Sequence, residues 1–557
     1  MNKYIIVGGV AGGATAAARL RRLDEEAEII LVERGGEISF ANCGLPYYVG
    51  GTIPERDDLL LMTPKRFHGL FNVDVRIHSE VIRVDTAQKK VTIRNGEQEY
   101  EEAYDALVLS PGAKPLRPPI PGIDHKNIVT LRNVPDADAL RQLAQRYANG
   151  KAVVVGGGFI GIEAAENLKE RGMEVTLVEA VPHILAPFDE DMVVLAEKEL
   201  RENGVRLILG SGVKEFAHVN EEQVEVHLAD GDSFSANLVV LAIGVRSDTG
   251  FLQGSGIRLG ERGHILVDEY MQTSAEGVYA VGDAVMTFDH QTGNEAALAL
   301  AGPANRQARL VADNIAGRKR KYHGVIGSSI LKVFGLTAAS TGKNERTLNR
   351  EGLRYGEDYR YTLTYPTSHV TYYPGADVFA LKMIFSMKDG TVLGAQAIGK
   401  AGVDKCIDTV AAVLQFGGTI YDLIDLELSY APPFGAAKAP LNMAGYYADN
   451  ILQGLADPLR PDELSQEMEQ GAQVIDLRSP ALYQEWHIEG AINIPTEQLR
   501  NNLDKLDRER PILLVCKTGL NGYFMERMLT QRGFKARNLM GGCTYLVAFK
   551  ERAPKNQ

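Results

Sequence analysis

The sequence predicts an α/β protein with two Rossmann-like dinucleotide-binding units, followed by an α+β segment and a small C-terminal α/β domain. Three observations support this architecture. An apolar strand, a glycine-rich turn, an alanine-rich helix and an acid-terminated strand follow one another twice before residue 180. Residues 326 to 445 alternate short apolar strands with a helix. A new apolar pattern begins after Pro461, which predicts an independent last domain.

Length and composition exclude several classes of protein. A chain of 557 residues is long enough for several domains, and 45% hydrophobic with 24% charged residues is typical of globular proteins. The net charge of -12 argues against a nucleic-acid or acidic-membrane surface. The first residues lack the pattern of a signal peptide, and no apolar run reaches membrane-spanning length. We therefore expect no nucleic-acid partner and no membrane association.

Four cysteines are spaced far apart, without a CxxC pair: Cys43, Cys406, Cys516 and Cys543. This spacing excludes a disulfide scaffold and a zinc-ribbon site, and we predict no metal. The expected compartment is the reducing cytoplasm. We interpret Cys406 and Cys543 as packing residues, whereas the surroundings of Cys43 and Cys516 indicate chemistry.

The first dinucleotide unit runs from a strand at residues 4 to 7 through a glycine turn and a helix at 14 to 23 to a strand ending at Glu33. Glycines let the backbone approach a pyrophosphate, and the helix N-terminus favours its charge. The unit departs from the second one at Val10, where the middle glycine belongs. The predicted contacts are Gly8, Gly9, Val10, Ala11, Gly12, Gly13, Glu33 and Arg34.

The second unit repeats this pattern, with a strand at residues 152 to 155, a helix at 162 to 171 and a strand ending at Glu179. An acid at that position accepts ribose hydroxyls and repels a 2′-phosphate, so Glu179 favours NADH while NADPH stays possible. The predicted contacts are Gly156, Gly158, Phe159, Ile160, Gly161, Glu179 and Gly244.

Two later strands also end in glycine turns, at residues 107 to 113 and 277 to 284. They add Ser110, Gly112, Gly282 and Asp283 to the first site. The second stretch resembles the two-dinucleotide flavoprotein reductases, in which the Asp receives a ribityl hydroxyl of FAD. This resemblance implies a discontinuous FAD domain at residues 1–112 and 245–325, and an NAD(P)H domain at 113–244.

Cys43 lies between the first acid and a helix that starts with a proline. A helix N-terminus and a neighbouring flavin would both favour the nucleophilic thiolate. The segment Ser-Phe-x-x-Cys-Gly-Leu-Pro-Tyr resembles the active site of coenzyme A-disulfide reductases and the related NADH oxidases and NADH-dependent persulfide reductases. The similarity extends over about 445 residues. Tyr48 stands where dithiol reductases carry a second cysteine, so the lone thiol must hold an outside partner.

The resemblance implies a substrate site for coenzyme A. Thr15, Arg19 and Arg22 lie on one face of the first helix, where they could meet phosphates. No lysine stands near Phe71, where the family carries a further one. By resemblance, the remaining coenzyme A contacts are Ser39, Asn42, Asn305, Tyr372 and Lys438.

Residues 326–445 resemble the dimerisation domain of this family. The resemblance implies a homodimer in which Tyr430 and Lys438 complete the site of the partner. Tyr372 and Tyr430 could donate to the sulfur that leaves Cys43. Both tyrosines could equally be packed aromatics.

After a linker at residues 446–460, residues 461–557 resemble a rhodanese domain. The resemblance rests on Asp476, on the stretch from His487 to Pro495, and on Cys516 between a strand and a helix. Loop N–H groups around Cys516 would stabilise a persulfide anion. The loop carries Asn521 where rhodanese loops usually end in Arg, so a vestigial module with a structural Cys516 is the alternative.

The sequence therefore predicts a flavoprotein that uses NAD(P)H to reduce coenzyme A persulfide, polysulfide or coenzyme A disulfide through FAD and Cys43, with Cys516 handling sulfane sulfur. Two alternatives stay open. One is an NADH oxidase that cycles Cys43 through sulfenic acid, which would need no cations for coenzyme A. The other is a redox-sensing sulfur-delivery protein with negligible turnover.

Overall fold

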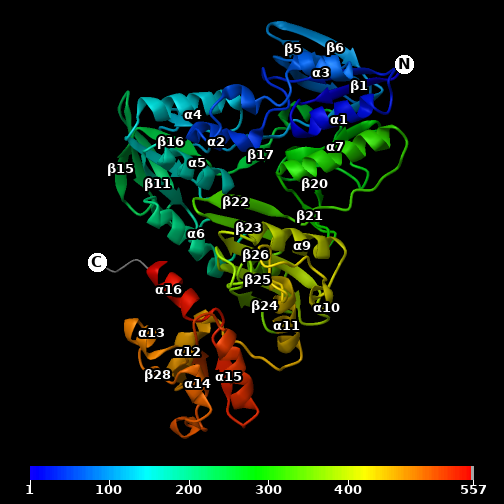
Figure 1. Cartoon of the computed structure of the whole chain (residues 1–557). Helices are drawn as coiled ribbons and strands as arrows, with labels where there is room; N and C mark the ends of the chain where they lie inside the picture. The colour runs from blue at the N-terminus through cyan, green and yellow to red at the C-terminus, as the bar shows by residue number, and fades with distance from the viewer. Residues whose placement is uncertain (553–557) are drawn as a thin grey trace. The chain divides into compact units, whose positions relative to one another are not determined.

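The computed structural model describes residues 1–552, and its chain divides into two compact units. The first unit contains Met1–Ile184 and Gly204–Val325, and the second contains Leu185–Asn203 and the chain from Ile326 onward. Each unit is described separately (Figure 1).

The first unit opens with a parallel sheet in the order β19-β7-β1-β2-β3. Its strands are β1 (Lys3–Val7), β2 (Glu28–Val32), β3 (Asp74–Arg76), β7 (Ala106–Leu109) and β19 (Val278–Ala280). Helices α1 (Ala11–Arg21) and α7 (Ala301–Ile315) pack against each other beside this sheet (Figure 1). Because Val7 is paired with Val32, the glycine turn after β1 and the acid after β2 meet at one sheet edge.

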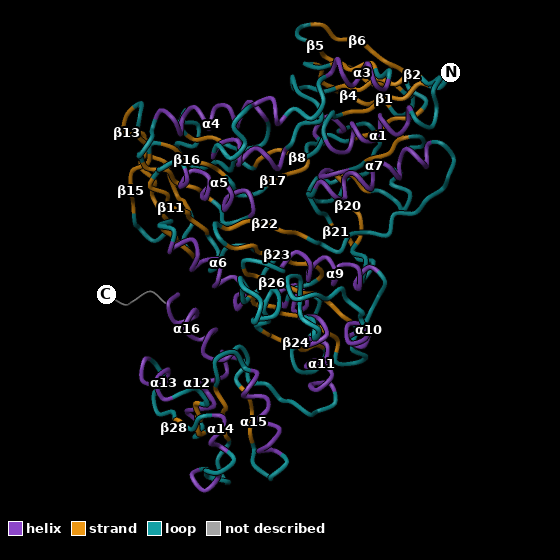
Figure 2. The backbone as a smooth tube through the Cα atoms, in the orientation of Figure 1, coloured by secondary structure: helices purple, strands orange, loops and turns teal. Residues whose placement is uncertain are grey.

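A second parallel sheet in the same unit has the order β12-β11-β10-β16-β9. Its strands are β9 (Ile128–Val129), β10 (Lys151–Val155), β11 (Glu174–Glu179), β12 (Arg206–Leu209) and β16 (Leu238–Leu241). Figure 2 shows α4 (Val134–Arg146) and α5 (Phe159–Glu170) beside its strands. The antiparallel pair β8 (Ala113–Pro115) and β17 (Val245–Ser247) marks the two crossings between the sheets, close to the predicted domain boundaries.

Smaller elements complete the first unit. Two antiparallel meanders and a three-stranded sheet are formed by β4 (Ser79–Asp85), β5 (Lys90–Asn95), β6 (Gln98–Ala103), β13 (Val213–Asn220), β14 (Gln223–Leu228), β15 (Ser233–Ala236), β18 (Ile265–Leu266), β20 (Val285–Phe288) and β21 (Glu295–Ala296). The short helices are α2 (Leu45–Gly50) and α3 (Pro64–Phe71).

The second unit contains a sheet in the order β22-β23-β26-β25-β24, in which neighbouring strands are antiparallel. The strands are β22 (Ser329–Val333), β23 (Leu336–Gly342), β24 (Tyr359–Thr364), β25 (Phe379–Ser386) and β26 (Val392–Gly399). The helices around it are α8 (Glu345–Arg350), α9 (Val403–Gln415), α10 (Ile420–Asp425) and α11 (Pro440–Leu452).

Helix α6 (Glu190–Glu202) belongs to the second unit, although it lies inside the predicted NAD(P)H domain. The physical reason is a buried ion cluster. The fully buried Lys382 ammonium lies 3.1 Å from Asp189, 2.7 Å from Asp191 and 2.5 Å from Glu345. This cation offsets part of the negative charge of the three carboxylates, and the Arg460 guanidinium lies 3.5 Å from Glu345 as a second cation.

The last domain has a parallel sheet in the order β28-β27-β29-β30. Its strands are β27 (Gln473–Asp476), β28 (Ile492–Asn493), β29 (Ile512–Val515) and β30 (Ala536–Asn538). Its helices are α12 (Leu464–Glu469), α13 (Pro480–Glu485), α14 (Thr496–Leu499), α15 (Leu520–Thr530) and α16 (Gly542–Arg552).

The predicted α/β class is confirmed, and both glycine turns join a parallel strand to a helix. The helices begin three residues earlier than predicted, at Ala11 and Phe159, because the turns themselves supply the first helical residues. None of the helices between residues 1 and 552 combines the length and apolar character needed to cross a membrane.

Candidate active site

A cavity of about 910 Å³ opens at the carboxyl ends of the first parallel sheet. This is where open α/β sheets bind ligands, and the volume lies within the roughly 300–1,000 Å³ typical of ligand sites. The predicted residues that line it are Gly8, Gly9, Val10, Ala11, Gly12, Thr15, Glu33, Arg34, Ser39, Asn42, Cys43, Ser110, Gly112, Gly282, Asp283 and Asn305. One cavity therefore joins the predicted FAD site to part of the predicted coenzyme A site.

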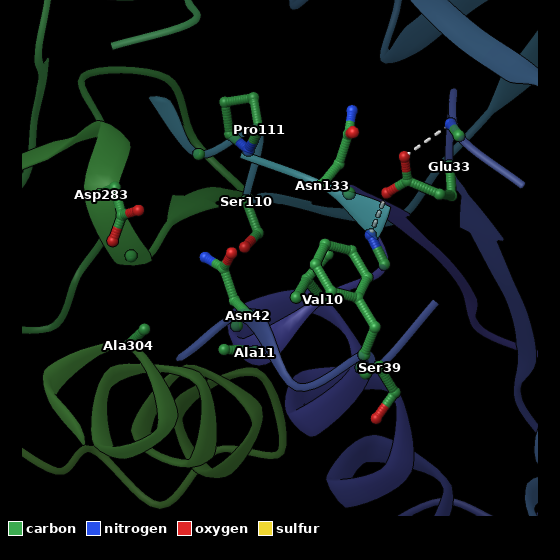
Figure 3. Close-up of a pocket in the computed structure, with 18 of the residues that line it drawn as sticks. Val10, Ala11, Glu33, Ser39, Asn42, Ser110, Pro111, Asn133, Asp283 and Ala304 are labelled. Atoms are coloured by element: carbon green, nitrogen blue, oxygen red, sulfur yellow. Dashed lines mark hydrogen bonds between the residues drawn. The ribbon is translucent and has the colours of Figure 1, made fainter. Parts of the chain in front are cut away.

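The glycine turn after β1 has the close packing that a dinucleotide cradle requires. Gly8 has φ +92°, and a Cβ there would lie 2.1 Å from the carbonyl oxygen of Ser110. A Cβ on Gly13 would lie 1.7 Å from the carbonyl oxygen of Gly8. The Glu33 carboxylate accepts hydrogen bonds from the N–H groups of Gly9 at 2.8 Å and Gly35 at 2.7 Å (Figure 3). These features fit FAD, because the helix N-terminus and the acid face the same cavity.

The second dinucleotide unit repeats this geometry. A Cβ on Gly161 would lie 1.9 Å from the carbonyl oxygen of Gly156, as in the first unit. The Glu179 carboxylate accepts from the N–H groups of Gly157 at 2.6 Å and Val181 at 3.0 Å. The same placement of glycines and acid makes this unit fit for a nicotinamide dinucleotide.

Cys43 lies in a single 3₁₀ turn, Asn42–Gly44, which leads directly into α2 with Pro46 near its start. Its thiol is exposed and faces the cavity. Burial by neighbouring atoms and the carboxylates of Glu163 and Asp283 raise the pKa of the Cys43 thiol. Burial and these two carboxylates therefore oppose the thiolate that we expected the surroundings of Cys43 to favour.

Glu163 is a residue of the site that sequence reasoning missed. It lies on α5, accepts a hydrogen bond of 3.3 Å from the Tyr47 hydroxyl, and belongs to the same unit as Cys43. Burial raises its pKa to about 7, so its charge changes near neutral pH. The available signal was its position two residues after the last glycine of the second motif.

Arg132 is a second missed residue. Its guanidinium lies 3.8 Å from the Asp283 carboxylate, and its backbone and guanidinium both contact the side-chain amide of Asn42. Figure 3 shows Asn42, Ser110 and Asp283 converging on the cavity. Burial raises the pKa of Asp283, and Arg132 partly opposes that effect. Arg132 thus contacts both Asn42, in the turn that carries Cys43, and Asp283, the predicted contact of the flavin ribityl chain.

The predicted coenzyme A contacts on α1 have different environments. The Thr15 hydroxyl donates to the Asn305 side-chain oxygen at 2.6 Å, and both residues line the cavity. Arg19 is committed to Asp313, with hydrogen bonds of 2.9 and 2.7 Å. Arg22 is exposed, with its guanidinium 6.0 Å from the ring centre of Phe71. Arg22 is therefore better placed than Arg19 to meet a phosphate.

Tyr372, Tyr430 and Lys438 belong to the second unit. The two tyrosine hydroxyls are 2.9 Å apart, while 72% of Tyr372 and 45% of Tyr430 is exposed. Lys438 is also exposed. A pair of solvent-facing phenols bonded to each other is unusual for packed aromatics and suits a surface that a partner covers.

Cys516 follows β29 at the carboxyl edge of the last sheet. Its sulfur accepts hydrogen bonds from the N–H groups of Gly519 at 3.1 Å and Gly522 at 3.3 Å. The Asn521 amide, which replaces the usual Arg, donates to Thr496 at 3.4 Å instead. The N–H groups form the predicted nest for an anionic sulfur.

These features define a class of protein. The first dinucleotide unit has a cavity with one cysteine in its wall, and a second dinucleotide unit lies in the same chain. This combination is typical of enzymes that transfer electrons from one nucleotide cofactor to another and then to sulfur.

The chain belongs to the pyridine nucleotide-disulphide oxidoreductase family. The model of that family matches residues 2–308, and the model of its dimerisation domain matches residues 328–440. A rhodanese-like domain matches residues 460–548. The predicted enzyme class, with FAD and NAD(P)H as cofactors, is confirmed.

Similar proteins include a reductase that matches about four-fifths of this chain and two solved structures that match nearly all of it. A coenzyme A disulfide reductase of Staphylococcus haemolyticus is 35% identical over 81% of this chain and 100% of its own length. Among solved structures, reduced Bacillus anthracis CoADR-RHD is 44% identical, covers 99% of both chains and has a TM-score of 0.95. An NAD-dependent persulfide reductase from A. fulgidus is 36% identical, covers 98% of this chain and 99% of its own, and has a TM-score of 0.92.

Proposed function

We propose that this enzyme uses NAD(P)H to reduce coenzyme A persulfide, polysulfide or coenzyme A disulfide through FAD and Cys43. The observation that carries the proposal is that Cys43 is the one cysteine among the residues that line the cavity. Tyr48, which stands in the sequence where a second thiol would be, is a buried aromatic residue. A lone thiol can only exchange sulfur with a partner from outside. The two full-length structural relatives support this substrate class.

FAD would be held by Gly8, Gly12 and Glu33, with Asp283 at the ribityl chain, and would supply a two-electron relay from the nicotinamide to sulfur. The Glu179 carboxylate favours NADH over NADPH, because it would repel a 2′-phosphate.

Cys43 carries the sulfur chemistry. Its thiolate attacks the coenzyme A sulfur of the persulfide, forming a Cys43–coenzyme A disulfide and releasing hydrosulfide. Two electrons from NAD(P)H then cleave this mixed disulfide, returning the Cys43 thiolate and releasing coenzyme A. With coenzyme A disulfide, the first leaving group is coenzyme A thiolate. Thr15, Asn305, Ser39 and Asn42 would position the substrate, with Arg22 and Arg19 near its phosphates.

We further propose that the enzyme works as a cytoplasmic homodimer. The dimerisation domain carries Tyr372, Tyr430 and Lys438, which would complete the partner's site by donating to the leaving sulfur and to a phosphate. Four free cysteines suit a reducing compartment. Cys516 would carry sulfane sulfur to coenzyme A, although Asn521 removes the usual loop cation.

NADH oxidation with oxygen is a second candidate, favoured by the water-forming NADH oxidase from Lactobacillus brevis, which is 28% identical, covers 82% of this chain and all of its own, and has a TM-score of 0.78. The test is anaerobic NADH oxidation with coenzyme A persulfide and coenzyme A disulfide as separate acceptors, beside an aerobic reaction without them. Rapid turnover with a coenzyme A acceptor supports the proposal. Turnover with oxygen alone would replace it with the oxidase, and a single flavin reduction without turnover would indicate a redox sensor.

A further inference from the structure

A second cysteine lies beside the sulfur-carrying loop of the last domain. β29 ends at Val515 and β30 at Asn538, and these strands are parallel neighbours, so the residues that follow them meet at one sheet edge. Cys516 begins the loop that leads into α15, and Cys543 is the second residue of α16. The sequence predicts Cys543 to be a packing residue, and its proximity to Cys516 is visible only in the fold.

Backbone contacts hold the two cysteines together. The Cys543 N–H donates to the carbonyl oxygen of Cys516 at 2.9 Å, and the Thr544 N–H donates to that of Lys517 at 3.0 Å. Gly542 has φ +55°, and a Cβ there would lie 2.3 Å from the Cys516 carbonyl oxygen. The start of α16 therefore packs directly on the cysteine loop, and the two backbones are in hydrogen-bonding contact.

The two thiols share one buried environment. Cys516 is 3% exposed and Cys543 is 4% exposed. Burial raises the pKa of Cys543 to about 12, the Arg478 guanidinium lowers it, and Asp476 and Cys516 raise it. Arg478 is itself fixed by Asp476 through bonds that include one of 2.7 Å. Cys543 is thus a protonated thiol that responds to the charge on Cys516.

We infer that Cys543 is a resolving thiol for sulfur carried on Cys516. In this step the Cys543 sulfur attacks the inner sulfur of the Cys516 persulfide. A Cys516–Cys543 disulfide forms, the bond to the outer sulfur breaks, and that sulfur leaves as hydrosulfide with the Cys543 proton. The outer sulfur is reduced to sulfide, and the two cysteines are oxidised to the disulfide, so no external oxidant is needed.

This step sets the fate of the carried sulfur. When an acceptor thiol is present, the outer sulfur passes to it; when none is present, the disulfide closes and stops further loading until a dithiol reopens it. Transfer to an acceptor and closure of the disulfide therefore compete for the same persulfide. Asn521 allows this competition, because its amide donates to Thr496 and supplies no positive charge that would hold the persulfide. The inference rests on the proposed role of Cys516 as a sulfur carrier.

The experiment uses the full-length chain with Cys43→Ser, so that Cys43 does not consume sulfur, and treats it with inorganic tetrasulfide without NADH. Released sulfide is measured, and unreduced peptides are mapped by mass spectrometry. We expect a cross-link between the Cys516 and Cys543 peptides, formed together with sulfide and reversed by dithiothreitol. Adding Cys543→Ser should abolish the cross-link and leave one extra sulfur atom on Cys516.

Cys406→Ser is the matched control, because Cys406 is also buried and its pKa is likewise raised to about 12 by burial. This variant should still form the cross-link. The inference would be overturned if the protein with Cys543 intact kept an extra sulfur on Cys516 and formed no cross-link. This result does not depend on whether the Cys543 variant folds. An unmodified Cys516 would also overturn it. The assay contains no NADH or coenzyme A, so failure of the proposed reductase activity would be seen separately.

Discussion

Cys43 and Cys516 are both free cysteines in turns that lead into helices, but the protein treats them differently. Cys43 is exposed in the cavity wall, and the neighbouring carboxylates Glu163 and Asp283 raise its pKa together with burial. Cys516 is buried, and two backbone N–H groups point at its sulfur. The Cys43 thiol therefore faces the cavity, but burial and the two nearby carboxylates disfavour its thiolate. The Cys516 sulfur has N–H donors for an anion but little contact with solvent.

This difference assigns the two sulfurs to different tasks. A thiol facing a large cavity can admit a bulky partner, and its reactivity can rise when a cofactor or substrate brings compensating charge. A sulfur enclosed by N–H groups can store a small anionic group such as a persulfide. A change at Cys43 or its surroundings should therefore leave the chemistry of Cys516 unaltered, and a change at Cys516 should leave that of Cys43 unaltered.

The largest effect is expected from Cys43→Ser. Removing the nucleophile should lower the rate of NADH oxidation with coenzyme A disulfide by about 10³-fold or more, because no other cysteine lines the cavity. Steady-state assays measure the rate, and the visible spectrum reports bound flavin. A variant that retains most of its activity while binding flavin would show that Cys43 is not the redox thiol.

Cys516→Ser should have a selective effect. With tetrasulfide and a small amount of coenzyme A as the sulfur source, we expect NADH oxidation to fall roughly tenfold or more, because the carrier sulfur is missing. With preformed coenzyme A disulfide, the rate should stay at the wild-type level. Cys406→Ser is the control for both assays. Equal activity of Cys516→Ser and wild type with tetrasulfide would indicate a vestigial tail.

Sequence reasoning succeeded where the chemistry is local. The glycine turns, Glu33 and Glu179 lie within single strand–turn–helix–strand segments, and the structure places both acids on the N–H groups of their own turns. Val10 departs from the motif without steric consequence for the protein. At Gly158, the equivalent position in the second unit, a Cβ would meet no atom within 4 Å.

It failed where partners come from distant segments. Glu163 and Arg132 approach the turn of Cys43 from more than 80 residues away in sequence. Glu163 is marked only by its position after the second glycine motif, and Arg132 belongs to none of the predicted motifs. The ion pair between Arg19 on α1 and Asp313 on α7 likewise joins distant segments, and the predicted contact of Arg19 with a phosphate stays a prediction. Cys543 is buried, as expected of a packing residue, and only the sheet order brings it to Cys516.

Thr15→Val tests whether the cavity beside Cys43 binds the substrate. Loss of the hydroxyl that donates to Asn305 should raise KM for coenzyme A disulfide roughly five- to tenfold, the equivalent of about 1 kcal/mol, with little change in KM for NADH. Steady-state kinetics measure both constants. Thr15→Ser keeps the hydroxyl and should restore the wild-type KM, whereas equal KM values in Thr15→Val and wild type would remove this residue from the substrate site.

The smallest effect concerns the charge that holds Cys43 back. The pKa of Glu163 is about 7, so Glu163 is charged above that pH and neutral below it. Its negative charge raises the pKa of Cys43. In Glu163→Gln, the Cys43 pKa should therefore be lower, and Cys43 should react faster with iodoacetamide above about pH 7. Below that pH, where wild-type Glu163 is also neutral, the two proteins should react alike.

Peptide mapping of the alkylated protein distinguishes Cys43 from the buried Cys516, whose extent of alkylation should be the same in both proteins and serves as an internal reference. Glu170→Gln is the matched control, because Glu170 lies two turns further along α5 and is exposed. Identical Cys43 profiles in Glu163→Gln and wild type across the pH range would mean that the Glu163 charge does not affect the thiol. The raised pKa of Cys43 would then be caused by burial rather than by Glu163. In that case a bound cofactor would increase the reactivity of Cys43 by changing the surroundings of the thiol, not by compensating the Glu163 charge.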